Sequence, residues 1–257
     1  MSKPTVLFIS HRDRNCGVYQ FGKNIAGALE RSSRFAYRYV ECGSAADLRA
    51  VAEDRDVAAI IYNHHPATAP WLTIGETRRL NVPHLGIVHE VTQEVADGLG
   101  TTLFDYHIAP DPSLLLRNPR VFKTGRFIPE YRNERATPDV PTIGSFGFAT
   151  AGKNFDALVE RVQSEFDHAV VRLHIPFAHF GDASGEQARR VAAACRALVK
   201  KPGIDLRITH DFMGDDALLD FLASNSLNAF LYADGNGRGS SSTLDYAFRA
   251  LRREPGE

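Results

Sequence analysis

This 257-residue sequence has little cysteine, and it lacks an excess of charge of one sign and long apolar runs. Its three cysteines, Cys16, Cys42 and Cys195, are odd in number and form no Cys-x-x-Cys pair. Such a set argues against a disulfide framework and favours a reducing compartment. The 30 Lys and Arg residues nearly balance the 31 Asp and Glu residues. No global field therefore recruits nucleic acid or an acidic membrane, and any anion site must be local.

Targeting and membrane-spanning segments are also lacking. The first residues, MSKPTVLFIS, have neither the apolar length nor the small-residue cleavage site of a signal peptide. No window approaches the roughly 18 apolar residues of a transmembrane helix. We therefore expect a soluble, cytoplasmic protein whose contact with a membrane is at most peripheral. The hydrophobic content of 44% is that of an ordinary globular chain, long enough for one large domain or two small ones.

The first half of the chain alternates between apolar runs and helical periodicity. Runs that are apolar on both faces and separated by helices indicate a parallel sheet covered on both sides. Right-handed crossovers make such a domain doubly wound. Helices are expected near 21–30 and 45–53. The expected strands are five, at 5–10, 35–41, 57–62, 83–89 and 105–109.

A change of composition divides the chain. The segment Pro129–Pro141 has three prolines, many charges and little apolar content, which predicts a linker. Strand–helix alternation restarts after it, with strands expected at 142–148, 169–175, 204–209 and 227–232. We predict two Rossmann-like doubly wound α/β domains, 1–128 and 142–257, joined by linker 129–141, with the ligand between them. The last helix is followed only by a few polar residues, which indicates a shortened second domain.

Two loops of the first half carry candidate chemistry. Gly17 lies between the first strand and its helix, where backbone can approach a ligand; an ordinary tight turn with Gly17 at positive φ is the alternative. The pattern is not G-x-G-x-x-G, so the dinucleotide fingerprint is absent. His89 and Glu90 end a buried strand, where open sheets place their sites. His89 could donate a hydrogen bond to a sugar hydroxyl with Glu90 orienting it, or be a satisfied histidine beside a capping Glu90.

The adjacent histidines His64 and His65 follow the third strand in the same way. A metal site is unfavoured there, because neighbouring side chains on an extended segment point apart and no third ligand has convincing spacing. Lining the acceptor side of the cleft is the expected role of His65. His174 and His179, at the end of a strand in the second half, are expected to be structural or to line the cleft.

The second half has two anion-friendly helix starts. Lys153 and Asn154 begin a helix after a glycine-bearing loop, where the helix dipole disfavours a cation unless an anion is bound. A solvated surface lysine is the alternative. The loop Asp234–Asp245 combines three glycines with Arg238, a bidentate phosphate partner, and with Ser240, a hydroxyl donor. Asp245 could accept bonds from ribose hydroxyls, or merely complement the helix dipole.

At these residues the chain resembles the retaining GT-B glycosyltransferases of the large bacterial group that assembles polysaccharides and glycolipids. Cys16-Gly17-Val18 resembles the glycine loop of that family. Val88-His89-Glu90 resembles its apolar-His-Asp segment, and Lys153-Asn154 its Lys-Gly or Lys-Asn. The stretch 227–245 resembles its strand and loop ending in two Glu eight positions apart, with Asp245 at the second. Gly237 stands where the first Glu is expected, and the family's last segment is missing.

The resemblance implies a hexosyltransferase-like enzyme that moves a sugar from a nucleotide-diphosphate donor to a hydroxyl acceptor with retention. The acceptor would be a glycan, a glycolipid or a small molecule. The resemblance also implies no metal, no cofactor and no covalent intermediate. Lys153, Arg238 and helix N-termini would neutralise the leaving group, and His89 would contact the sugar. Two alternatives stay open: a non-catalytic shortened relative that binds a nucleotide sugar or a partner, and a sugar-nucleotide epimerase, for which Glu90 is the obvious acid/base candidate.

Overall fold

The computed structural model describes residues 3–53, 56–132, 135–233 and 241–250. These form two compact units, the first running from Met1 to Phe127 and the second beginning at Ile128. Each unit is an α/β layer structure with one sheet, and every strand pairing in both sheets is parallel. The α/β class and the two parallel sheets expected from the sequence are confirmed. No helix in the described stretches combines the length and hydropathy needed to cross a membrane.

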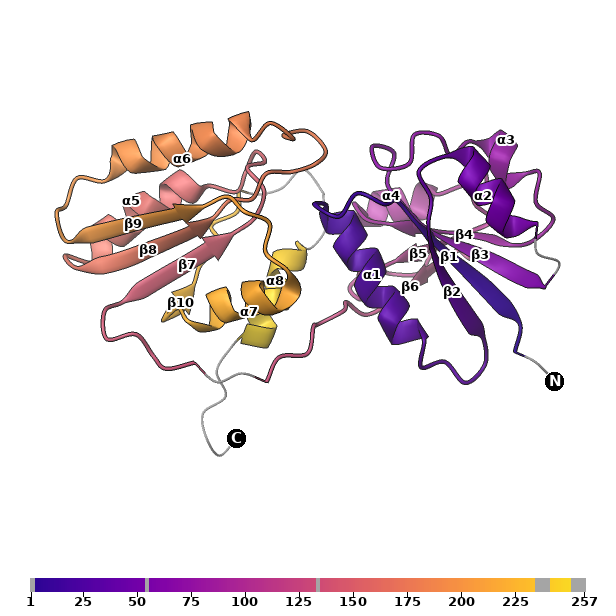
Figure 1. Ribbon diagram of the computed structural model, residues 1–257, viewed down its shortest axis with the longest axis horizontal. Coiled ribbons are helices and arrows are strands. Elements are labelled where there is room, and N and C mark those ends of the chain that lie inside the picture. The colour runs from indigo at the N-terminus through magenta and orange to yellow at the C-terminus, as the bar shows by residue number, and fades with distance from the viewer. Residues whose placement is uncertain (1–2, 54–55, 133–134, 234–240, 251–257) are drawn as a thin grey trace. The chain divides into compact units, whose positions relative to one another are not determined.

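The first unit has a six-stranded sheet in the order β2-β1-β3-β4-β5-β6. Its strands are β1 (Thr5–Ser10), β2 (Ala36–Glu41), β3 (Val57–His64), β4 (His84–Val88), β5 (Tyr106–Ala109) and β6 (Val121–Lys123). Its helices are α1 (Gly17–Leu29), α2 (Ala45–Ala52), α3 (Ile74–Thr77) and α4 (Gln93–Gly98). Figure 1 shows α1 and α2 on opposite faces of this sheet.

The sequence of strand β1 is apolar without alternation because both faces of the strand are buried. Val6 and Phe8 pack with Ala26 of α1 on one face of the sheet. Leu7 and Ile9 pack with Leu48 of α2 on the other face. Each face of the strand is thus buried under a helix, as a parallel sheet requires.

The second unit has a four-stranded sheet in the order β10-β7-β8-β9. Its strands are β7 (Thr142–Phe146), β8 (Ala169–His174), β9 (Ile204–Thr209) and β10 (Leu227–Asn228). Its helices are α5 (Phe155–Glu165), α6 (Glu186–Leu198), α7 (Asp215–Ala223) and α8 (Ser242–Ala250). One core packs the sheet against α5 and α6, and a second packs Phe146 against α7 and α8. Figure 1 shows these two helix pairs on opposite faces of the sheet.

The structure differs from the expected elements at a new strand and at several element ends. The first sheet has a sixth strand, β6, which gave no apolar signal because Phe122 and Lys123 are exposed and only Val121 is buried. Helix α1 begins at Gly17, four residues before the expected start, and Gly17 does not have positive φ. Strand β10 ends at Asn228 and not at the expected residue 232. The expected strand was too long because the apolar residues Phe230 and Tyr232 continue the run after the backbone pairing has ended.

The segment that the sequence predicts as a linker packs on the second unit. The Tyr131 hydroxyl donates a hydrogen bond to Asp220 of α7, 2.7 Å away, and Arg135 pairs with the same carboxylate. Arg249 of α8 donates to the Tyr131 carbonyl over 2.9 Å. The residues from Tyr131 to Arg135 that the structure describes are therefore held against α7 and α8.

Candidate functional site

In both sheets the order of the strands reverses beside the first strand, and each reversal marks a candidate site. In the first sheet β1 lies between β2 and β3, so the strand order reverses at β1 and β3. In the second sheet β7 lies between β8 and β10, so it reverses at β7 and β10. Open α/β sheets bind ligands beyond the carboxyl ends of the strands at such points. The candidate residues that the structure describes lie at these two places.

In the first unit the carboxyl ends of β1, β3 and β4 are joined by one side-chain amide, that of Asn63. Its Nδ2 donates to Ser10 Oγ of β1 over 2.9 Å and to the Val18 carbonyl of α1 over 2.6 Å. Its Oδ1 lies 2.7 Å from His89 Nε2. Asn63 and Ser10 are each 2% exposed. A single buried amide therefore positions His89 relative to the first strand and helix.

The close approach of α1 depends on Gly22. A Cβ atom at this position would lie 2.3 Å from Asn63 Nδ2 and 3.1 Å from Ser10 Oγ. These distances leave no room for a side chain, so any other residue would push the helix or the amide out of place. Glycine at position 22 is thus a requirement of the Asn63 hydrogen bonds.

The hydrogen bonds of Asn63 determine the protonation of His89. The Val18 carbonyl can only accept, so the amide atom facing it must be Nδ2 and the atom facing His89 must be Oδ1. Because Oδ1 also only accepts, His89 Nε2 carries the proton. Burial, together with His65, His64, His11 and Arg126, lowers the pKa of His89 to about 3. At neutral pH the ring is therefore neutral, and Nδ1 has a free lone pair.

This arrangement leaves His89 a different ring nitrogen from the one expected to act. Its N–H bond is already used by Asn63, so the nitrogen left over is Nδ1, a hydrogen-bond acceptor. The ring packs edge-on against Phe21 of α1, with centroids 5.0 Å apart. Glu90 does not orient the ring: it is exposed and makes no hydrogen bond or ion pair with the residues that the structure describes.

We expect the tautomer of His89 to be visible by NMR. In long-range 1H–15N spectra of the ¹⁵N-labelled protein at neutral pH, Nδ1 should give the resonance of an unprotonated nitrogen and Nε2 that of a protonated one. Asn63→Asp should raise the pKa of His89, because a carboxylate favours the imidazolium form. Asn81→Asp adds the same charge at the opposite end of this sheet and should leave His89 unchanged. A proton on Nδ1 of the wild-type protein would contradict the assignment.

Gly17 and His65 lie near this network. Gly17 is the first residue of α1, whose first turn has no acidic residue and no side-chain cap. His65 follows β3, and its Nδ1 accepts a hydrogen bond from Ala67 N over 3.2 Å. His64 points to the other face of the sheet and contacts Phe104, and burial and His65 lower its pKa to about 4.

In the second unit the loop from Gly147 to Asn154 connects β7 to α5. Gly147 has φ +146° and Gly152 has φ +83°, both outside the range that side chains readily allow. Asn154, the N-cap of α5, has φ 50°, and its side chain makes no capping hydrogen bond. A short polar side chain tolerates this left-handed conformation. The loop therefore depends on residues that tolerate positive φ, and the side chain of the N-cap residue does not cap the helix.

Lys153 is the cation of this loop. It is half-buried, with Nζ 4.0 Å from the centre of the Tyr232 ring and 3.3 Å from Ser241 Oγ. Gly147 lies against it, since a Cβ atom at this position would be 3.6 Å from Nζ, at van der Waals contact. Within the described ranges no carboxylate forms an ion pair with it. A half-buried cation without a carboxylate favours a bound anion.

The Ser241 hydroxyl beside the ammonium group belongs to a small hydroxyl cluster in the segment after β10. Ser241 Oγ lies 2.8 Å from Thr243 Oγ1, and the Tyr232 hydroxyl is 2.5 Å from the same atom. Asp245, in the first turn of α8, is only 8% exposed. The structure thus brings Lys153, Ser241 and the start of α8 together. Arg238 and Ser240, the other expected donor-binding residues, lie outside the described residues.

His174 is a structural residue of this unit. It is 2% exposed, its Nδ1 lies 2.8 Å from Thr209 Oγ1, and burial lowers its pKa to about 4. Its carbonyl accepts a hydrogen bond from Gly147 N over 3.0 Å. His174 therefore supports the Lys153 loop through its backbone.

Sequence reasoning missed Ser10, Asn63 and Tyr232, whereas Ser241 belongs to the Ser240–Ser242 run expected to supply hydroxyl donors. In the stretch 63–65, the two histidines were considered as ligands and Asn63 was not. Asn63 is nevertheless the residue that faces α1. In the part of the chain that the structure describes, no group of three or more His, Cys, Asp or Glu residues could hold a metal ion. Gly17 and His89 belong to the first unit, and Lys153 and Asp245 to the second. Their convergence on one opening stays a prediction.

The comparisons with known proteins concern the fold. The sequence matches no protein-family model and no curated protein. A structure of Anabaena HepE in complex with UDP and glucose is similar with a TM-score of 0.62 and 11% identity, over 96% of this chain and 78% of the other. An alpha-glucosyltransferase in complex with UDP gives 0.55 and 11%, over 96% and 78%. Staphylococcus aureus MnaA with UDP gives 0.50 and 11%, over 88% and 73%. Over most of its length the chain thus has the two-sheet α/β fold of GT-B glycosyltransferase structures.

Proposed function

We propose that the protein binds a nucleotide-diphosphate sugar and transfers its sugar to a hydroxyl acceptor with retention of configuration. Lys153 is the observation that carries the proposal: a half-buried cation at a strand-order reversal, beside a helix start whose N-cap side chain makes no hydrogen bond, and without a carboxylate partner among the described residues. A diphosphate matches these features, because backbone N–H groups and an ammonium group can share its charge. The similar structures of HepE and an alpha-glucosyltransferase contain UDP.

In this proposal each unit supplies one part of the chemistry. Lys153 and the N-termini of α5 and α8 stabilise the negative charge that develops on the leaving diphosphate. Asp245 and Ser240 bind the nucleoside side of the donor, and Arg238 adds a second cation. His89 contacts the transferred sugar as a neutral acceptor through Nδ1, held by Asn63. Gly17 and His65 belong to the acceptor side.

A screen of nucleoside diphosphates and their sugars for thermal stabilisation tests the binding step. A ligand at 100 times its dissociation constant should stabilise the protein by roughly 2.7 kcal/mol. Incubation with the stabilising sugar nucleotide and simple glycosides then separates three outcomes. Transfer or hydrolysis supports the proposal, and the anomeric configuration of the product, read by NMR, tests retention. Epimerisation, or binding without turnover, would contradict the transfer reaction.

A further inference from the structure

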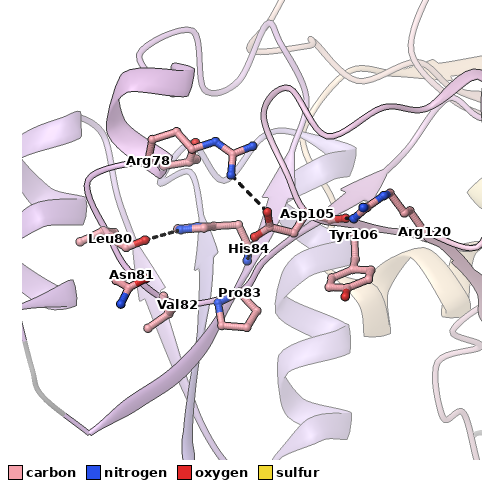
Figure 2. A pocket seen from close by; sticks show the side chains of 10 residues that line it. Arg78, Leu80, Asn81, Val82, Pro83, His84, Asp105, Tyr106 and Arg120 are labelled. Carbon is pink, nitrogen blue, oxygen red and sulfur yellow. Dashed lines mark hydrogen bonds and ion pairs between the residues drawn. The ribbon is translucent and has the colours of Figure 1, made fainter.

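A cavity lies in the first unit at the sheet edge opposite to His89. It has a volume of about 530 Å³ and is lined by residues before and at the amino ends of β4, β5 and β6 (Figure 2). This volume is within the range of small-molecule sites. Neither the nucleotide-sugar residues nor the acceptor-side residues named above belong to its lining.

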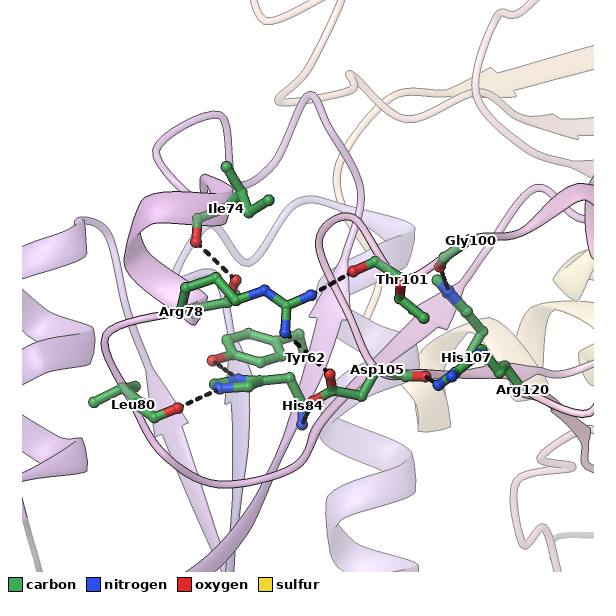
Figure 3. A network of polar contacts seen from close by, with 11 residues as sticks. Tyr62, Ile74, Arg78, Leu80, His84, Gly100, Thr101, Asp105, His107 and Arg120 are labelled. Carbon is green, nitrogen blue, oxygen red and sulfur yellow. Dashed lines mark hydrogen bonds and ion pairs between the residues drawn. The ribbon is translucent and has the colours of Figure 1, made fainter.

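The floor of the cavity is an ion pair held by backbone. Arg78 Nη1 lies 3.3 Å from Asp105 Oδ1, and Nη2 donates to the Thr101 carbonyl over 2.5 Å. Asp105 Oδ2 accepts from His84 N over 2.9 Å. Figure 3 shows these contacts as one continuous network. The carboxylate is therefore fixed in place, and each of its oxygens has one further lone pair for a ligand.

Buried His84 makes this floor rigid. Its Nε2 lies 3.2 Å from the Leu80 carbonyl, which only accepts, so Nε2 carries the proton. Its Nδ1 then accepts from the Tyr62 hydroxyl over 2.9 Å. Both ring nitrogens are satisfied, and the side chain is 3% exposed. The residues between Leu80 and His84 are thus anchored at both ends.

The walls differ from the floor because their polar groups are available. Asn81 is exposed, and no residue in the described ranges hydrogen-bonds to its side chain or to the Tyr106 hydroxyl. Tyr106 is 37% exposed and lines the cavity together with Pro83. Arg120 donates to the Asp105 carbonyl over 3.2 Å, and its guanidinium lies 5.9 Å from the Tyr106 ring centre.

Charge favours an acidic ligand. Arg78 and Asp105 compensate each other, whereas Arg120 forms no ion pair with a described carboxylate. The lining therefore has one surplus positive charge. An aromatic ring offers a negatively polarised face on which the C–H groups of a sugar ring pack. Asn81 and Asp105 can exchange hydrogen bonds with hydroxyl groups.

We propose that this pocket binds an acidic pyranose, a uronic-acid residue of a glycan, through the Tyr106 ring, the Asn81 amide and the Arg120 guanidinium. Such a site goes beyond the transfer reaction, since it would hold a glycan chain on the first unit away from His89. A neutral sugar would use the ring and the amide but leave the charge of Arg120 unpaired. A simple inorganic anion would leave the aromatic wall unused.

Two matched probes test the proposal, methyl β-D-glucuronide and methyl β-D-glucoside, which differ in a carboxylate. At low ionic strength we expect saturation-transfer NMR with the full chain to show binding of both, with the glucuronide about tenfold tighter, the lower end for a hydrogen bond to a charged group at an exposed site. Tyr106→Ala should abolish both signals. Arg120→Gln should remove only the preference for the glucuronide. Phe122→Ala, which removes an exposed ring beside Tyr106 but outside the pocket, should change neither.

Each remaining outcome overturns the proposal or part of it. No saturation transfer from either sugar, or transfer that persists in Tyr106→Ala, would exclude the pocket as a sugar site. Equal binding of the two glycosides would exclude recognition of the acid. The titration contains no nucleotide, so its failure leaves the proposed transfer reaction untouched, and failure of nucleotide binding leaves this site untouched.

Discussion

Lys153→Met is expected to weaken the binding of UDP and GDP by about 10- to 150-fold and to leave the binding of uridine and guanosine unchanged. A hydrogen bond to a charged group contributes about 1.5–3 kcal/mol, which corresponds to this range of affinity. Methionine keeps most of the aliphatic stem and removes the ammonium group, which lies over the Tyr232 ring and beside Ser241. Calorimetric titration with the four ligands measures the difference.

The control for this variant is Lys200→Ala. Lys200 is exposed and follows α6 in the same unit, where its Nζ donates to the Ala197 carbonyl. Its removal changes the net charge equally and should change no affinity. If Lys153→Met bound each diphosphate as tightly as the wild-type protein, Lys153 would be a surface lysine. Asp245→Asn should differ from both, because it should weaken nucleotide and nucleoside alike if Asp245 binds ribose.

Mild acid is expected to destabilise the protein through its buried histidines. Burial lowers the pKa of His64 and His174 to about 4 and that of His89 to about 3, against about 6.5 in an unfolded chain. As the pH falls below about 6.5, the unfolded state takes up protons that the folded state excludes. The free energy of unfolding is therefore undiminished above about pH 6.5. Below this pH it falls by up to about 1.4 kcal/mol per pH unit for each of these histidines.

His174 is the sharpest test of this expectation because it is 2% exposed. Urea denaturation at pH 7 and at pH 5 should show a smaller loss of stability for His174→Asn than for the wild-type protein, by up to about 2 kcal/mol over this interval. Thr209→Val removes the hydroxyl partner of His174 and keeps the titrating group. It should lower stability at both pH values and retain the wild-type pH dependence. Equal pH dependence in His174→Asn and wild type would refute the assignment.

The sequence predicted the sheets well, because burial on both faces leaves an unbroken apolar run. It missed β6, in which one side chain is buried, and it extended β10 beyond Asn228, because Phe230 and Tyr232 are apolar without belonging to the ladder. An apolar run indicates that a segment is buried. It does not indicate where a strand ends, because that depends on backbone hydrogen bonds, which the residue types do not specify.

The candidate site was predicted only in part for a related reason. Histidine and lysine are conspicuous by their chemistry, so His89 and Lys153 were found. Asn63 was not found, since an asparagine at a strand end is common. Its role depends on the backbone carbonyl of Val18, and backbone carbonyls occur at every residue, so they give no signal in a sequence. The partner of His89 was therefore expected to be the adjacent Glu90, while the structure supplies it from a neighbouring strand.

The hydrogen bonds of Asn63 also have a direction. His89 donates to Asn63, and Asn63 in turn donates to Ser10, so the bond dipoles are aligned head to tail. Aligned hydrogen bonds polarise one another. Each step draws electron density toward the histidine, which makes its Nδ1 a better hydrogen-bond acceptor than it would be without this chain. The acceptor strength of His89 Nδ1 is thus set partly by Ser10 of β1, two hydrogen bonds away.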